Sequence, residues 1–398
     1  MEFDFTSIID RSGTGATAAE IIPFPGAEVE EGYDRIPMWV ADMNFATVPA
    51  VTKALHARID HPCFGYFITP PAYYDAVIHW QQQRNGVEDL TRECIGYENG
   101  VLGGVVSALQ AFSAPGDPVL VHSPTYIGFT GILTNNGRKV VHSDLVKDEN
   151  GVWRMDYEDM ERKLRDENIH IAIMCSPHNP CGRVWERWEL EKAMELYRKY
   201  DCVVISDEIW SDIIMPGHKH VPTASVSEDA KNRTVALYAL SKTFNLAGLV
   251  GSYHIIYNKY LRDRVVKQSS LAHYNDANLL SVEALIAAYT DEGERWVDEL
   301  NTVLDENLRL TCEFLTEKVE GVAVTRPEGT YMLYLDCSGW CEKNGVEIDE
   351  LIRRGIAKGV IWQDGRPFNR PCAIRMNVAL PTERVKEALS RLDGVFNG

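Results

Sequence analysis

The 398-residue sequence has no long hydrophobic run and a shortage of positive charge. No stretch approaches the ~20 consecutive apolar residues that a membrane helix needs, so none is expected. The first residues lack the basic start and apolar core of a secretion signal, which favours a cytoplasmic protein. Forty basic residues against 58 acidic ones give a net charge of −18. This argues against nucleic acid and anionic membranes as partners.

Two sequence signatures are also absent. The nine cysteines do not form the paired C-x-x-C knuckles of a zinc site. No G-x-G-x-x-G motif opens the first strand–helix unit, which argues against a nicotinamide dehydrogenase. His218-Lys219-His220 follows Pro216-Gly217 and precedes Pro222, and we interpret it as an exposed loop rather than a metal site.

Short apolar runs alternate with longer amphipathic ones between about residues 100 and 257. This pattern predicts a mostly parallel α/β sheet with helices on both faces. Such sheets bind ligands at the carboxyl ends of their strands. The predicted strands are Pro118–Ser123, Lys139–Asp144, Ile169–Cys175, Cys202–Ser206, Thr234–Ala239 and Leu249–Ile256.

The C-terminal third has a different pattern. A long helical region is predicted from Asn278 to Lys318, with a break near Gly293. Strands and helices then alternate in an order typical of a smaller α+β domain. The predicted strands are Val322–Thr325, Thr330–Leu335, Val360–Trp362 and Ala373–Ala379, and the predicted helices are Asp349–Lys358 and Thr382–Phe396.

The most informative stretch is Ser241-Lys242-Thr243, directly after a predicted buried strand. A buried lysine is costly unless its charge is removed or paired. One solution is a Schiff base with an aldehyde, and pyridoxal 5′-phosphate is the aldehyde cofactor that many enzymes hold in this way. The alternative for the tripeptide alone is a lysine whose ammonium reaches solvent from the strand end.

Three other side chains follow predicted strands and could serve such a cofactor. Asp207 could pair with the pyridine nitrogen, Asn179 could bond the phenolic oxygen, and Tyr126 could stack on the ring. Each has an ordinary alternative: a salt-bridged or capping aspartate, an asparagine that caps its own turn, and a tyrosine buried in the core.

Anion-binding groups are also present. Leu102, Gly103 and Gly104 precede a predicted helix at Val105–Phe112, where backbone N–H groups could bind a phosphate, and Ser241 could add a hydroxyl. Arg375 lies inside an apolar predicted strand and therefore needs a planar anionic partner. A substrate α-carboxylate would suit it, and so would an internal aspartate or glutamate.

Together these motifs resemble those of the fold-type I pyridoxal phosphate enzymes, in the aminotransferase class I/II superfamily. Within it, the chain most resembles the bacterial cystathionine β-lyase (C–S β-lyase) branch, over nearly its whole length. The motifs that carry the resemblance are Pro37–Met43, Phe64–Tyr66, Ser123–Tyr126, Ser176–Trp185, Ser206–Ile209, Ser241–Gly248, Glu328–Tyr331 and Arg375–Asn377.

The resemblance implies the aspartate aminotransferase fold. We expect a large cofactor-binding α/β domain at residues 47–285 with a mostly parallel seven-stranded sheet, and a smaller α+β domain at residues 286–398. Residues 1–46 are expected to pack on the small domain and the pocket. The resemblance also implies a homodimer with shared active sites, in which Tyr66 reaches the cofactor phosphate of the neighbouring subunit.

The resemblance also assigns roles. Lys242 would be the catalytic residue, bound to pyridoxal phosphate and exchanging the proton at Cα of the substrate. Arg375 would hold the substrate carboxylate, with Trp39 and Ala41 beside it. The implied cofactor-binding residues are Lys242, Asp207, Asn179, Tyr126, Leu102, Gly103, Gly104, Ser241 and Tyr66.

The implied reaction is cleavage of L-cystathionine, related cysteine S-conjugates or cysteine to a thiol, pyruvate and ammonia. That reaction belongs to sulfur amino acid metabolism and methionine biosynthesis. The alternative is an aminotransferase that passes the amino group to a 2-oxo acid, because both reactions begin by removing the Cα proton. A ligand-sensing protein without turnover is disfavoured, because lysine, aspartate and arginine are all retained.

Three positions depart from the expected family pattern. Trp210 stands where aminotransferases usually carry tyrosine and the lyase branch often histidine, and tryptophan can donate one hydrogen bond but accept none. Asn44 replaces a more usual aspartate, and Thr17–Glu20 stands where Lys-Trp-Asp is expected. These changes bear on the substrate more than on the core chemistry.

Overall fold

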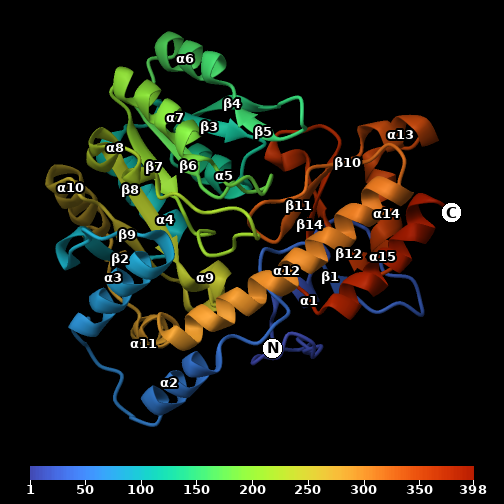
Figure 1. The fold of residues 1–398 in the computed structure, drawn as a ribbon, viewed down its shortest axis with the longest axis horizontal. Helices are drawn as coiled ribbons and strands as arrows, with labels where there is room; N and C mark the ends of the chain where they lie inside the picture. Colours follow the sequence, from blue (N-terminus) through green and yellow to red (C-terminus); the bar gives the residue numbers. More distant parts are fainter.

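The central sheet forms from the predicted apolar runs. In a computed structural model that describes residues 1–398, eight strands lie in the order β2-β9-β8-β7-β6-β3-β4-β5 (Figure 1). Strands β3, β4, β6, β7 and β8 pair in parallel, and β9 and β5 pair antiparallel to their neighbours. All six strands predicted from the sequence are present, and β2 and β5, which were not predicted, bring the sheet to eight strands where the resemblance implied seven. The strands are β2 (Ile95–Asn99), β3 (Pro118–Ser123), β4 (Lys139–Lys147), β5 (Trp153–Met155), β6 (Ile171–Cys175), β7 (Val203–Asp207), β8 (Thr234–Ala239) and β9 (Gly251–Ile255).

Helices cover both faces of this sheet, as predicted. One apolar cluster joins α4, α5 and α10 to the strands, and a second joins α6, α7 and α8 to the opposite face. The buried strands therefore expose neither face to water, which explains why they are apolar throughout. The helices are α4 (Val101–Phe112), α5 (Ile127–Asn135), α6 (Tyr157–Asp166), α7 (Arg187–Lys199), α8 (Glu228–Arg233) and α10 (Lys259–Ser270).

A smaller antiparallel sheet has the order β10-β11-β14-β13. The N-terminal segment joins this region, because β1 (Ile36–Pro37) pairs in parallel with β12 (Val360–Ile361). The other elements here are β10 (Ala323–Val324), β11 (Met332–Asp336), β13 (Gln363–Asp364), β14 (Ala373–Asn377), α1 (Thr17–Glu20), α13 (Ser338–Asn344), α14 (Ile348–Ala357) and α15 (Thr382–Phe396).

The two sheet regions are joined by α12 (Asp291–Lys318), which runs from α11 (Leu279–Ala288) to α15 (Figure 1). The remaining helices, α2 (Pro49–Ile59) and α3 (Pro71–Asn85), lie against α11. The expected domain boundary at residue 285 falls within α11, and the division into 1–46, 47–285 and 286–398 stays a prediction.

One predicted helix boundary was confirmed and another was wrong. The helix break predicted near Gly293 falls at Tyr289-Thr290, where the Thr290 hydroxyl caps α12 by accepting from the Gly293 N–H at 3.4 Å. Helix α4 begins at Val101 rather than Val105, because Gly100 takes the N-cap position with φ +83°. Gly103 and Gly104 therefore lie inside the first helical turn and not before it.

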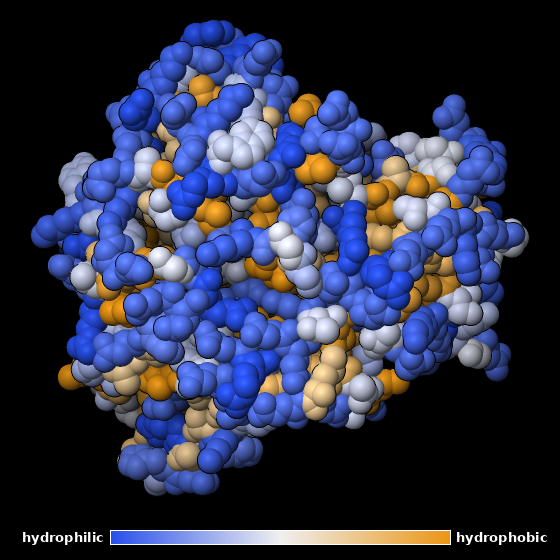
Figure 2. Space-filling model, in the orientation of Figure 1, coloured by the Kyte–Doolittle hydropathy of each residue, from blue (hydrophilic) through white to orange (hydrophobic).

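The surface agrees with the composition. Figure 2 shows one face covered mostly by hydrophilic residues with hydrophobic ones scattered between them, as the net charge of −18 suggests. No helix combines the length and apolar character that crossing a bilayer requires.

A tight junction connects the turn after β6 to the loop before β11. Glu328 and Gly329 both donate backbone N–H groups to the Gly182 carbonyl, at 2.8 and 3.0 Å. Gly182 has φ +66°, and a Cβ there would lie 2.5 Å from the Pro327 Cβ and 2.9 Å from the Gly329 oxygen. The junction therefore requires glycine both for its backbone angle and for its space.

Replacing Gly182 tests this junction. We expect Gly182→Ala to destabilise the protein by about 1–2 kcal/mol for the left-handed backbone and roughly 1–3 kcal/mol more for the overlap. Gly151→Ala is the matched control, since Gly151 has φ +75° and nothing within 4 Å of a Cβ. Urea unfolding, followed by circular dichroism, measures the free energy of unfolding of both variants. Equal losses in the two variants would show that the close contact at Gly182 contributes nothing.

Candidate active site

Lys242 lies in α9 (Leu240–Thr243), one turn beyond the carboxyl end of β8. Its half-buried side chain donates from Nζ to the Ala41 carbonyl at 2.7 Å. Burial, together with the charge of Arg375, lowers the pKa of Lys242 to about 8, although Asp42 and Asp207 act to raise it. The amine can therefore lose its proton near neutral pH, as a nucleophile or base must. The side chain does not extend from the strand end into solvent.

Asp207 is the last residue of β7 and is 4% exposed. Its Oδ1 accepts from the Ile209 N–H at 3.0 Å, and no cationic side chain lies within 4.0 Å. Burial raises the pKa of Asp207 to about 7, against the opposing effect of the Lys242 charge. The salt-bridge alternative therefore fails, whereas the capping alternative describes the contact of Oδ1 with the Ile209 N–H. A cationic ligand atom would still relieve this buried carboxylate.

Arg375 lies in the middle of β14 and is 4% exposed. It donates to the Asn179 Oδ1 at 3.3 Å and to the Trp39 carbonyl at 3.0 Å, and its Nε has no partner. Burial lowers the pKa of Arg375 to about 10. No carboxylate lies within ion-pair distance, so the alternative of an internal aspartate or glutamate also fails. A substrate anion would provide the missing charge.

Asn179 and Tyr126 lie beside these charges. Because the Asn179 oxygen accepts from Arg375, its amide NH2 remains as a donor. Tyr126 is the N-cap residue of α5, and its half-buried ring packs edge-on against Phe129 with centroids 5.3 Å apart. Burial raises the pKa of Tyr126, and the charges of Arg375 and Asp207 both act on it. The structure therefore brings these residues to the same pocket.

The start of α4 is close-packed. Gly103 and Gly104 both donate to the Gly100 carbonyl at 3.1 Å. A Cβ on Gly104 would lie 2.6 Å from the Leu237 side chain of β8, and one on Gly103 would overlap the Tyr274 ring. With Leu102 they form the first turn of a 12-residue helix, whose positive end attracts anions. Ser241 lies half-buried in α9.

Residues 39–45, here called the N-terminal strip, form the wall between the two sheet regions. Asn377 donates from Nδ2 to the Val40 and Asp42 carbonyls, both at 2.6 Å. Asn245 donates to the Met43 and Phe45 carbonyls at 2.9 and 3.1 Å, and accepts from the Met43 N–H. Neither asparagine was predicted as a site residue. Both lie in the motifs that carried the resemblance.

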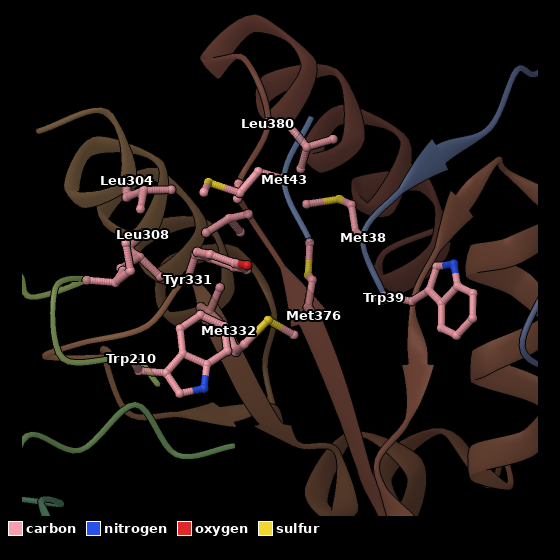
Figure 3. Packing of buried hydrophobic residues seen from close by; sticks show 14 of the residues in the cluster. Met38, Trp39, Met43, Trp210, Leu304, Leu308, Tyr331, Met332, Met376 and Leu380 are labelled. Carbon is pink, nitrogen blue, oxygen red and sulfur yellow. The ribbon is translucent and has the colours of Figure 1, made fainter. Parts of the chain in front are cut away.

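Three more side chains at the pocket were not predicted. The Tyr331 hydroxyl donates to the Ala41 carbonyl at 3.2 Å, the same oxygen that accepts from Lys242. Arg11 forms a bidentate ion pair with Asp42, with 2.6 Å between Nη2 and Oδ2. Figure 3 shows Tyr331 next to Trp210, with Met43, Met376 and Leu380 on the other side of it. Tyr331 lies in one of the motifs that carried the resemblance, but neither it nor Arg11 was assigned a role at the site.

A buried polar network surrounds Glu208, the residue that follows Asp207. Glu208 accepts from Tyr238 at 2.6 Å, His220 at 2.8 Å and Ser206 at 2.9 Å. Burial is the largest single effect and disfavours its charge, but the contacts with His220, Tyr238 and the Thr223 N–H together outweigh burial, and the pKa of Glu208 is lowered. His220 is only 4% exposed, so the prediction of an exposed loop was wrong for this residue. Its partner lies 12 positions earlier, and no local pattern indicates the pairing.

Trp39 and Ala41, which were predicted to contact the substrate, lie in the N-terminal strip. Tyr66, which was predicted to contact the cofactor, does not. Trp39 and Ala41 accept from Arg375 and Lys242 through their carbonyls. Tyr66 is fully exposed, in an extended segment between α2 and α3. The structure does not bring Tyr66 to the pocket of its own chain.

The model of the family "Aminotransferase class I and II" matches residues 35–392. The chain belongs to this family. Among curated proteins, cystathionine beta-lyase PatB of Bacillus subtilis is 37% identical over 92% of this chain and 93% of its own. A PLP-bound C–S lyase from Staphylococcus hominis has a TM-score of 0.89 and 30% identity, covering 100% of this chain and 99% of its own. A PLP-bound putative aminotransferase from Clostridium difficile has a TM-score of 0.90 and 31% identity over 99% of this chain and 100% of its own.

The aminotransferase class I and II match includes every predicted site residue, from Trp39 to Arg375. Only Arg11, which pairs with Asp42, lies before it. The similarity to structures at about 30% identity over full length confirms the predicted fold.

The titration of Asp207 generates a stability prediction. The ligand-free folded protein keeps the Asp207 proton up to about pH 7, whereas the unfolded chain releases it near its ordinary value of 3.8. The unfolded state therefore binds fewer protons between about pH 4 and 7, and stability falls as pH rises through that window. Asp207→Asn removes this loss. We expect ligand-free Asp207→Asn to be more stable than wild type at about pH 8, by up to about 4 kcal/mol, and nearly equal at about pH 4.

Thermal unfolding of both ligand-free proteins at the two pH values measures the difference. Asp60→Asn, at an exposed position, controls for loss of a carboxylate outside the pocket. A variant that is less stable than wild type at the higher pH would contradict the assignment.

Proposed function

We propose that this protein is a pyridoxal phosphate-dependent C–S β-lyase. It would cleave L-cystathionine, related cysteine S-conjugates or cysteine to a thiol, pyruvate and ammonia. The observation that carries the proposal is a buried arginine without a carboxylate partner, Arg375, beside the amine of Lys242. Similarity to PatB, named a cystathionine beta-lyase, supports the reaction type.

The pocket residues fit the cofactor. Lys242 would bind it covalently through Nζ, and Asp207 would receive the cationic pyridine nitrogen that its buried carboxylate lacks. The free NH2 of Asn179 would donate to the phenolic oxygen, and Tyr126 would stack on the ring. The α4 turn of Leu102, Gly103 and Gly104 would hold the phosphate together with Ser241.

The mechanism follows from the protein groups. Bound pyridoxal phosphate supplies an electron sink for the bonds at the substrate Cα. Arg375 would bind the α-carboxylate in a bidentate pair, held by its hydrogen bond to the Trp39 carbonyl, while the Ala41 carbonyl accepts from Lys242. Once its Nζ is no longer bonded to the cofactor, Lys242 would take the Cα proton on Nζ as general base. The bond from Cβ to sulfur breaks with its electron pair on sulfur, and the thiolate leaves.

An aminotransferase remains the second candidate, because the C. difficile relative carries that name. Both reactions need Lys242, Asp207 and Arg375 in the same positions. They differ after proton removal, when either a group leaves Cβ or the proton is returned to the cofactor.

We also propose where the reaction takes place and how the chain assembles. We place the reaction in sulfur amino acid metabolism and methionine biosynthesis, in the cytoplasm. We also propose a homodimer, because Tyr66 is fully exposed and could complete the phosphate site of a second copy. The large domain at 47–285, with the small domain at 286–398 and the segment 1–46, would then form each protomer.

The decisive experiment replaces the lysine. Lys242→Ala should lose the visible absorption of bound pyridoxal phosphate and lower the rate of pyruvate release from L-cystathionine by roughly 100- to 10,000-fold. Lys219→Ala, in the exposed part of a loop, is the control and should keep both the visible absorption and the rate of pyruvate release. Pyruvate formed without added 2-oxo acid supports the lyase. Amino transfer that requires a 2-oxo acid, with no pyruvate from cystathionine, would identify an aminotransferase instead.

Shared active sites can be tested with mixed dimers. Tyr66→Ala and Lys242→Ala should each be nearly inactive as homodimers. A purified dimer with one subunit of each has one site with both Lys242 and Tyr66, so we expect about half of the wild-type activity. If Tyr66 instead served its own subunit, both sites of the mixed dimer would be defective and no activity would return.

A further inference from the structure

The indole of Trp210 faces the amine of Lys242. The Lys242 Nζ lies 5.6 Å from the centre of the Trp210 ring, within the range of a cation–π interaction. Trp210 is 1% exposed and Lys242 is half-buried, so the indole is shielded from water. The Asp207 Oδ1 accepts from the Ile209 N–H, and this turn directs the chain from β7 toward Trp210.

Trp210 is held rigidly in this position. Its ring packs edge-on against Tyr331, with centroids 4.7 Å apart and planes at 75° (Figure 3). The Tyr331 hydroxyl donates to the Ala41 carbonyl, the oxygen that also accepts from Lys242. Three elements, the loop after β7, the loop before β11 and the N-terminal strip, therefore surround a single amine.

We propose that Trp210 is a positioning residue, whose ring face and the Ala41 carbonyl together hold the Lys242 ammonium whenever that amine is not bonded to the cofactor. The inference rests on the proposed function. When Lys242 takes the Cα proton, the C–H bond breaks, its electron pair stays with the substrate, and a new N–H bond makes Nζ cationic. The indole face stabilises that cation where it forms, which a leucine could not do.

The charged groups around Lys242 favour such a contact. Arg375, on β14, repels the ammonium, whereas Asp42 on the N-terminal strip and Asp207 on β7 attract it. None of the three is within ion-pair distance of Nζ. The Ala41 carbonyl accepts a hydrogen bond from the amine, the Trp210 ring centre lies 5.6 Å from it, and neither group adds a full negative charge.

The test uses protein stripped of cofactor. Its rate of pyridoxal phosphate capture is followed by visible absorbance and rises as Lys242 loses its proton. The pH midpoint of capture therefore reports the pKa of the Lys242 amine. Loss of a cation–π contact should lower this midpoint by roughly 0.5 to 1.5 pH units in Trp210→Leu, with Trp210→Phe in between. Loss of packing alone would admit water and raise the midpoint toward the ordinary lysine value. The direction of the shift therefore separates the two roles.

A second measurement preserves the shape of the side chain. Fluorinated tryptophans placed at position 210 weaken the negative ring face without creating a cavity. We expect the midpoint to fall stepwise with the number of fluorines. Turnover of cystathionine by Trp210→Leu should show kcat lower by about 3- to 30-fold, with KM changed less than about twofold.

The outcomes are distinct. An unchanged or raised midpoint in Trp210→Leu, or no trend in the fluorinated series, would overturn the inference. A lowered midpoint without pyruvate release by wild type would support Trp210 while rejecting the β-lyase. If wild type captured no pyridoxal phosphate at any pH, both the cofactor assignment and this role would fail.

Discussion

The active site depends on how the carbonyls of the N-terminal strip are satisfied. This segment is not a strand of either sheet, yet much of it is buried, so its backbone oxygens need donors from elsewhere. They accept in succession from Arg375, from Asn377, from Lys242 and from Asn245. Two of the donors lie on β14 of the four-stranded sheet. The other two lie in α9 and just after it, in the segment that follows β8 of the eight-stranded sheet. One irregular segment therefore fixes the distance between the cation at the carboxylate position and the amine.

The same arrangement sets the electrostatics. Lys242 and Arg375 each donate to a backbone carbonyl, which leaves their charges unneutralised. Burial lowers both pKa values, and the charge of Arg375 lowers that of Lys242 further. Asp207 is buried nearby with its pKa raised. The pocket therefore has cations without anions on one side and a carboxylate without a cation on the other. An amino acid and a cationic heterocycle would complete both sides, and neither alone would do so.

Local patterns predicted much of this correctly. The strand at Thr234–Ala239 and the helix at Thr382–Phe396 match their predicted bounds, because apolar runs and helical periodicity are properties of adjacent residues. Lys242, Asp207 and Arg375 stood out because a charged residue beside an apolar run needs an explanation. Asn377, Asn245 and Tyr331 were missed as site residues because their partners lie some 200 to 337 positions away. His220 was assigned to the surface because a buried carboxylate partner leaves no trace in the surrounding loop.

Reaction type is the property that the shared residues encode least. Lys242, Asp207 and Arg375 act before elimination and transamination diverge, so their geometry suits both. The choice must lie in groups that control the amine after it has taken the proton, because its next donation decides between the two outcomes. Trp210 and Tyr331 contact that amine and its carbonyl partner directly, and neither can accept the proton as a histidine could. If the ring holds the ammonium as proposed, the proton would stay longer on Nζ, and loss of a group from Cβ would compete better with amino transfer.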